Sequence, residues 1–134
     1  MAASPPISNM EALVEQLAVE TQKRKRRGLL QTCREWWNAA MVSRLYDEMV
    51  RLARIDLKQA ERLADAALWV SEQLTDDEGS HAIGLRAVGH VHFLKGDQTP
   101  ALEHYQAALR IYERLGKEVE VGRTLGEIRS GRTD

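Results

Sequence analysis

The chain repeats part of itself at an offset of 41 residues, and this echo constrains its fold more than any other feature. Six positions in one segment find their own residue type again at that distance. The pairs are Ala60 and Ala101, Ala66 and Ala107, Ala67 and Ala108, Leu68 and Leu109, Glu72 and Glu113, and Leu74 and Leu115. A period of roughly 30 to 50 residues is typical of stacked helical repeats, in which one helix pair cannot bury its apolar face alone. We therefore expect a chain that builds a surface for holding other molecules.

The second copy of the repeat has the residue spacing of a known family. Its markers are Leu85, Gly89, Gly96, Ala101, Tyr105 and Ala108, which lie 4, 7, 5, 4 and 3 residues apart. This pattern resembles the tetratricopeptide repeat, a pair of antiparallel helices. Because Gly89 and Ala101 lack bulk, we expect the two helices to approach closely and Tyr105 to fill the space beside them. His92 and Glu113 stand where the family usually has Tyr and Pro, which fits a repeat of about 40 residues rather than 34.

The resemblance implies a domain organisation. We expect a disordered tail over 1–8, an N-terminal helical segment over 9–37 and tetratricopeptide-like repeats over 38–134. The repeat units would be 41–79, 80–121 and a partial third over 122–134. The first unit matches loosely, since Glu48 stands where a small residue is expected. The string from Leu45 to Trp69, with the long repeat after it, also resembles segments upstream of CHAT peptidase domains in bacterial proteins.

Local signals predict six helices and no strand, and hence an all-α fold of antiparallel pairs stacked as a short α-solenoid. Ser8 and Glu11 form a capping box at the first helix start, and the basic run Lys23–Arg27 suits a helix C-terminus, with Gly28 stopping or bending the helix. The next helical stretches are 29–37, which is ambiguous, then 41–54, 56–74, 82–95, 99–115 and about 117–130. Asp56 and Thr99-Pro100 are start signals, and Gly96 and Gly116 are stop signals.

Bulk properties exclude several classes of protein. The chain has 134 residues, 43% of them apolar and 29% charged, which indicates one globular domain. Its net charge of −1 provides no overall field for nucleic acid or an anionic membrane. No run of 18 apolar residues occurs, and the single Cys33 fits a reducing compartment. We expect a cytoplasmic protein with neither a nucleic-acid nor a membrane partner.

No residue pattern predicts catalysis, a metal or a cofactor. His90 and His92 would point about 200° apart on a helix, so they cannot share one ion. Cys33 lacks any local signature of a base or an oxyanion donor, and burial beside Trp36 and Trp37 is the better interpretation. The run Lys23–Arg27 suits either phosphate binding or a solvated helix end, and its acidic upstream helix favours the solvated end. We expect a protein that is not an enzyme.

The resemblance also implies a binding surface. In the family, certain positions of each first helix line a concave face, and here they fall on Ile83, Arg86, His90 and Phe93. Leu94 occupies a further such position, but we expect it to pack on neighbouring helices. Arg86 would be an exposed charge and His90 would lie on an exposed face, beside apolar groups suited to a peptide or protein partner.

The last helix predicts self-association. Val119, Val121, Leu125 and Ile128 form an apolar stripe with no following helix to cover it, and such stripes usually find a partner. We expect Val121, Leu125 and Ile128 to make the contact. A two-fold homodimer is the simplest result. Three functions stay open at this point. The leading one is an interaction module, and the alternatives are a regulatory segment of a larger enzyme, such as a CHAT-type peptidase, and a self-assembling structural protein.

Overall fold

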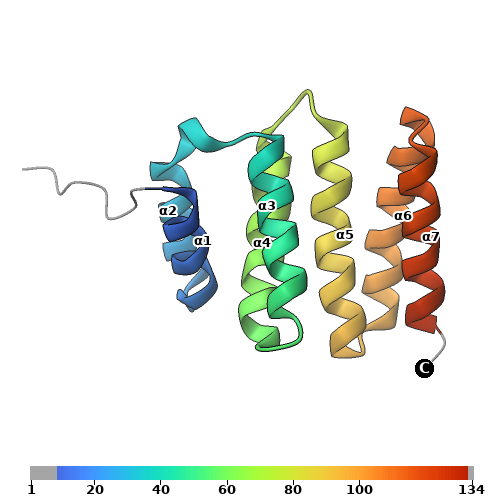
Figure 1. Cartoon of the computed structure of the whole chain (residues 1–134), viewed down its shortest axis with the longest axis horizontal. Helices are drawn as coiled ribbons and strands as arrows, with labels where there is room; N and C mark the ends of the chain where they lie inside the picture. Colours follow the sequence, from blue (N-terminus) through green and yellow to red (C-terminus); the bar gives the residue numbers. More distant parts are fainter. Residues whose placement is uncertain (1–8, 133–134) are drawn as a thin grey trace, which may run out of the picture.

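The computed structural model describes residues 9–132, and within that range it contains seven α-helices, one short 3₁₀-helix and no strand (Figure 1). The elements are α1 (Met10–Val19), α2 (Lys23–Thr32), η1 (Arg34–Trp36), α3 (Ala39–Leu52), α4 (Leu57–Gln73), α5 (Glu78–Lys95), α6 (Gln98–Leu115) and α7 (Glu118–Arg132). The all-α prediction is confirmed, with seven helices in place of six. The tail predicted over 1–8 lies outside the described residues.

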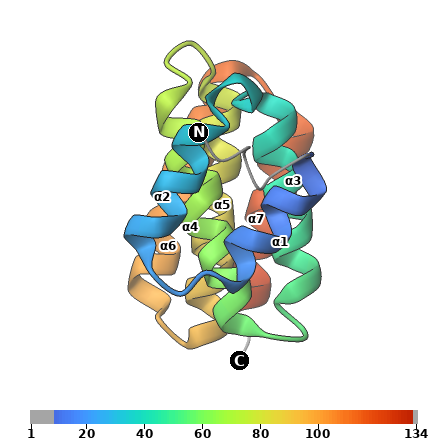
Figure 2. The ribbon, with the colours of Figure 1, turned by 90° about the vertical axis from the view of Figure 1, so that its left-hand side faces the viewer.

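The helices lie side by side in chain order and form two layers. Tight turns at the same end of the molecule join α3 to α4 and α5 to α6, so each pair is antiparallel (Figure 1). Along the row of helices, α2, α4 and α6 lie on one side and α1, α3 and α7 on the other, with α5 between them (Figure 2). Because α5 is recessed, α3 and α7 flank it on the same side of the molecule.

The N-terminal helices differ from the sequence prediction. Asn9 caps α1 by accepting from the backbone N–H of Ala12 at 2.9 Å, whereas the predicted cap, Ser8, lies outside the described residues. The helix ends at Val19, before the basic run, and α2 continues through Gly28, so Gly28 neither stops nor bends it. The reason is tertiary, because a reversal of the chain between the two helices allows both α1 and α2 to pack against α4.

Most of the later helix ends follow the predicted signals. Asp56 accepts from the N–H of Gln59 at 3.2 Å, and Gly96 and Gly116 end their helices with φ of 86° and 71°, a conformation that favours glycine. The predicted starts of α3, α5 and α6 are late by two, four and one residues, respectively. The α5 helix begins at Glu78, capped by Asp77, and α6 begins at Gln98. In both cases an upstream aspartate takes the N-cap position.

The core is continuous through α1, α3 and α4 and smaller between α5 and α6. Large side chains with no more than 1% exposure fill the first part, namely Leu13, Leu17, Leu45, Met49 and Leu63. At Gly89, an added Cβ atom would lie 3.0 Å from the Tyr105 ring and 3.3 Å from the Ala101 carbonyl oxygen. The predicted close approach of these two helices is therefore confirmed.

The three tryptophans gather at the N-terminal end of the molecule. Trp37 packs edge-on to Trp69 with ring centroids 5.2 Å apart, and the Arg27 guanidinium lies 5.1 Å from the centre of the Trp69 ring. Trp36 packs on the same core cluster, which includes the buried Cys33. The predicted burial of Cys33 is thus confirmed. Over the described residues, each helix is too short or too polar to cross a lipid bilayer.

Candidate binding groove between α3, α5 and α7

A single buried arginine occupies the middle of the face that α3, α5 and α7 share. Arg86 projects from α5 and its side chain is only 8% exposed. Its Nε and Nη2 donate to the two carboxylate oxygens of Glu127 at 3.2 and 2.9 Å, and Nη1 donates to Glu120 at 3.1 Å. Its remaining bonds reach the hydroxyl oxygens of Tyr46 at 3.3 Å and Tyr112 at 3.4 Å. These five bonds match the five N–H donors of a guanidinium.

The network connects helices that are distant in sequence. Tyr46 belongs to α3, Tyr112 to α6 and both glutamates to α7, and the Tyr46 hydroxyl also donates to Glu127 at 3.3 Å. The guanidinium lies 5.2 Å from the Tyr46 ring centre and 5.9 Å from that of Tyr112, so cation–π attraction adds to the hydrogen bonds. Arg86 therefore fixes α3 and α7 relative to α5.

The Arg86 guanidinium stays charged although it is buried, because neighbouring groups stabilise the cation. Burial opposes the cation, but the hydrogen bond with Glu127 and the neighbouring Tyr46 outweigh it and raise the pKa of Arg86. Burial raises the pKa of Tyr46 to about 12, so this hydroxyl is protonated at neutral pH and able to donate. Burial likewise raises the pKa of Tyr112.

Two pockets flank Arg86 along this face. The Ile83 pocket, of about 410 Å³, lies between α3, α5 and α7 and is lined by Ser43, Tyr46, Asp47, Ile83, Lys117 and Arg123, among others. The Phe93 pocket, of about 540 Å³, lies between α5, α6 and α7 and is lined by His90, Phe93, Leu94, Tyr105, Gly126 and Glu127, among others. We call the two pockets with Arg86 between them the groove.

The structure brings the four predicted partner-binding residues to this groove, but not all as expected. Ile83 lines the first pocket, and His90 and Phe93 line the second. The expectation that Arg86 is an exposed charge is wrong, because α7 supplies two carboxylates that cover it. His90 is half-buried rather than exposed, and burial, with only partial compensation from Glu127, lowers its pKa.

Phe93 and Leu94 also differ from the prediction. Phe93 stacks on Tyr105 with ring centroids 5.1 Å apart, and its ring lies so near Gly131 that a Cβ atom there would be 2.6 Å away. Leu94 was expected to pack on neighbouring helices, yet it is 49% exposed at the pocket edge. The α7 helix thus covers Phe93 and leaves Leu94 open.

The predicted self-association residues divide between two faces of α7. Val121 is partly buried against the core cluster between α5 and α6, and Ile128 is half-buried, so both belong mainly to the inner face. Leu125 is 42% exposed, and Val119, the first residue of the predicted apolar stripe, is 68% exposed. An outward apolar surface exists on α7, but its members are Val119 and Leu125.

Sequence reasoning missed Tyr46, Asp47, Lys117, Glu120 and Glu127 as groove residues. A signal was present for two of them. Tyr46 and Glu127 lie 40 and 41 residues from Arg86, close to the 41-residue offset of the internal echo. The opposite charges of Arg86 and Glu127 at that distance were the available clue to their pairing.

Neither the described histidines nor Cys33 forms a group with the acids that a metal ion would need. In residues 9–132, there is no cluster of three or more His, Cys, Asp or Glu side chains with suitable geometry. His92 lies 3.3 Å from Asp97 and its ring centroid is 5.5 Å from that of His104.

No protein-family model, curated protein or solved structure matches this chain.

Proposed function

We propose that this chain is a non-catalytic interaction module of the tetratricopeptide type, and that its groove binds a peptide or protein partner. The observation that carries the proposal is the Ile83 pocket, an open space of about 410 Å³ between three helices. Its interior combines the apolar Ile83 with the aromatic Tyr46, and charged groups surround it. Pockets with this composition suit an apolar anchor side chain flanked by polar contacts.

The charges at the pocket edge favour a partner of mixed charge. Asp47 on α3 and Lys117, the residue before α7, are both exposed, and neither forms an ion pair among the described residues. They line the pocket from different elements and have opposite signs. A segment with an apolar side chain between one basic and one acidic residue would complement both charges, and that complementarity also sets its direction.

Arg86 supports binding without being a contact residue in this proposal. Its five hydrogen bonds hold α3, α5 and α7 at a fixed spacing before any partner arrives. A preformed pocket loses less conformational entropy on binding than one that must be assembled, so this arrangement favours affinity.

The test compares three baits in affinity capture followed by mass spectrometry. The groove variant Asp47→Lys/Lys117→Glu reverses both edge charges, and Glu103→Lys/Arg110→Glu reverses one acid and one base at exposed positions of α6 outside the groove. We expect a protein that the parent and the α6 control capture and that the groove variant loses, with all three melting alike because exposed charges add little stability. Partners that bind all three baits equally would refute the groove as the binding site.

A second candidate function, self-association, rests on a correspondence between α5 and α7. The sequence Arg86-Ala-Val-Gly-His-Val is matched 37 residues later by Arg123-Thr-Leu-Gly-Glu-Ile. In α5, the face that includes Leu85 and Gly89 packs against α6. The corresponding face of α7 includes Gly122, where an added Cβ atom would meet nothing within 4 Å. A second copy of the chain is the simplest cover for this face and for Val119 and Leu125 beside it.

A further inference from the structure

The basic run lies at the electrostatically unfavourable end of a helix. Lys23, Arg24, Lys25 and Arg26 form the first turn of α2, not the last turn of α1 where the sequence predicted them. A helix N-terminus has a partial positive charge, and this first turn contains no acidic residue. Gln22, the N-cap residue, makes no side-chain capping bond. Local conflicts of this kind are most often retained at functional sites.

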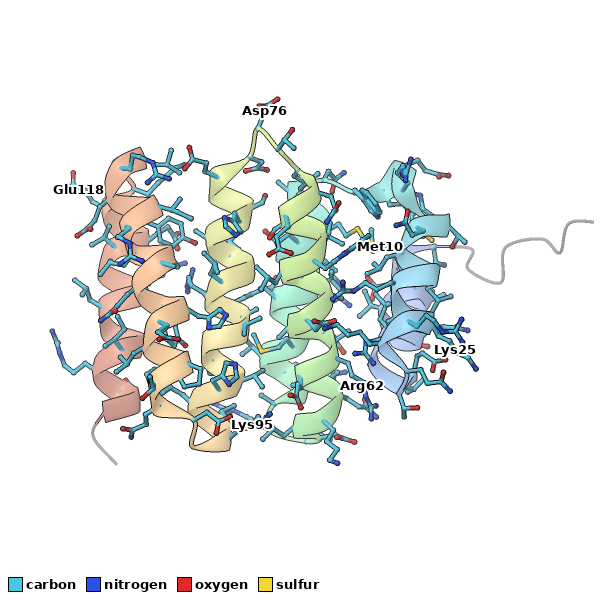
Figure 3. The ribbon with its side chains drawn as sticks, turned by 180° about the vertical axis from the view of Figure 1, so that it is seen from behind. Met10, Lys25, Arg62, Asp76, Lys95 and Glu118 are labelled. Carbon is cyan, nitrogen blue, oxygen red and sulfur yellow. The ribbon has the colours of Figure 1, made fainter. Side chains whose placement is uncertain are left out.

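A pocket of about 320 Å³ opens beside this helix start, between α2 and α4. Its cationic lining consists of Lys23, Arg26, Lys58 and Arg62, and its acidic lining of Glu61 and Asp65. In Figure 3, Arg62 reaches from α4 into the region between α4 and α2, whereas Lys25 points outward from α2 on the side away from α4. The run therefore contributes only some of its charges to the pocket.

Arg26 is buried in this pocket with part of its hydrogen-bonding capacity unused. The residue is 8% exposed, and Nη1 donates to the carbonyl oxygen of Glu20 at 2.8 Å. Its Nε atom is buried and has no hydrogen-bond partner within the described chain. Burial lowers the pKa of Arg26, Asp65 opposes this, and the neighbouring cations Arg62 and Arg27 lower it further. An anion bound in the pocket would offset the repulsion between these cations.

The acids of the pocket already have cationic partners. Asp65 lies 3.0 Å from Arg27 and 3.8 Å from both Lys23 and Arg26, so three cations share one carboxylate. Glu61 pairs with Lys95 at 2.8 Å. Lys58 and Arg62 form no ion pair with a described residue, and an excess of positive charge remains.

We propose that this pocket binds a phosphate-class oxyanion, either inorganic phosphate or the phosphomonoester of a small molecule, through Lys23, Arg26, Lys58, Arg62 and the uncapped N–H groups of α2. A tetrahedral dianion offers acceptors in several directions, which suits donors that converge from two helices and a helix N-terminus. The arginines are positioned in advance, since the Nη1 of Arg62 donates to the carbonyl oxygen of Ala18 at 2.8 Å, as that of Arg26 does to Glu20. This site lies on the opposite layer from the groove and does not depend on it.

Titration calorimetry with sodium phosphate, at an ionic strength held constant with sodium chloride, tests the proposal. We expect saturable binding to the parent and an affinity loss of more than about tenfold in Lys23→Gln/Lys58→Gln, which removes two exposed cations from the pocket edge. The matched control, Lys25→Gln/Arg24→Gln, removes two exposed cations of the same run that do not line the pocket, and should stay within about twofold of the parent. Circular dichroism checks that both variants keep the parent fold.

A second arm with O-phosphoserine distinguishes the two sources of the anion. Tighter binding than that of inorganic phosphate identifies a phosphomonoester as the ligand, and weaker binding identifies free phosphate. Absence of saturable binding for both probes overturns the proposal. An equal loss of affinity in the pocket variant and the control variant also overturns it, because the run would then act as a solvated patch of charge.

Discussion

Arg86 shows how strongly one buried charge depends on its neighbours. Its guanidinium satisfies every donor with groups from three other helices, and the two glutamates that receive it are only about 30% exposed. Removing such a cation leaves carboxylates without compensation in a partly dry environment, which costs more than the loss of a surface ion pair. Arg86 therefore stabilises the fold, although the family resemblance implied that it lies on a binding surface.

We expect Arg86→Met to lower the free energy of unfolding by about 2–4 kcal/mol, as measured by urea denaturation. Arg86→Glu should cost more, since it places a third carboxylate beside Glu120 and Glu127. Arg110→Glu, at an exposed position of α6, is the control and should change stability by less than about 0.5 kcal/mol. If Arg86→Met were as stable as this control, the hydrogen-bond network would not be formed in solution.

Sequence signals located the ends of helices correctly where the physical cause of the end is local. Gly96 and Gly116 marked helix ends because the backbone there needs a left-handed residue, and Asp56 marked a start because its side chain caps the nearest free N–H group. Gly28 failed as a stop signal, since glycine is tolerated in an exposed helix and the break depends on how α1 and α2 both contact α4. Likewise, nothing local to α7 reveals that it covers Arg86 and Phe93.

The close contact between α5 and α6 leaves no room for a larger residue at position 89. Gly89→Leu should destabilise the fold by about 1–3 kcal/mol, because Tyr105 and the Ala101 carbonyl already occupy the space. Gly28→Leu is the matched control, since an added Cβ atom on this exposed helical glycine meets nothing within 4 Å. It should leave stability unchanged or raise it by up to about 1 kcal/mol. Thermal melts that rank the two variants in the opposite order would contradict the observed packing.

For the whole molecule, the uncovered face of α7 predicts a homodimer. Sedimentation at micromolar concentration should show a dimer for the parent and a monomer for Val119→Glu/Leu125→Glu, because two buried carboxylates would disrupt an apolar contact. The control Val50→Glu/Ile55→Glu changes two side chains of similar exposure elsewhere, 37% and 68% against 42% and 68%. It should remain a dimer. A parent that sediments as a monomer would refute the prediction, and so would a dimer that survives the α7 substitutions.

The tryptophan and tyrosine rings lie in different regions of the molecule. All three tryptophans lie at the end formed by η1, α2 and α4, while Tyr46, Tyr105 and Tyr112 all line the groove. Tryptophan emission therefore reports on the packing of η1 against α4, and tyrosine absorbance reports on the α3–α5–α7 face. A partner seated in the groove changes the second signal and leaves the first nearly constant. With unmodified protein, the two optical signals can thus follow two separate regions of the molecule during unfolding or binding.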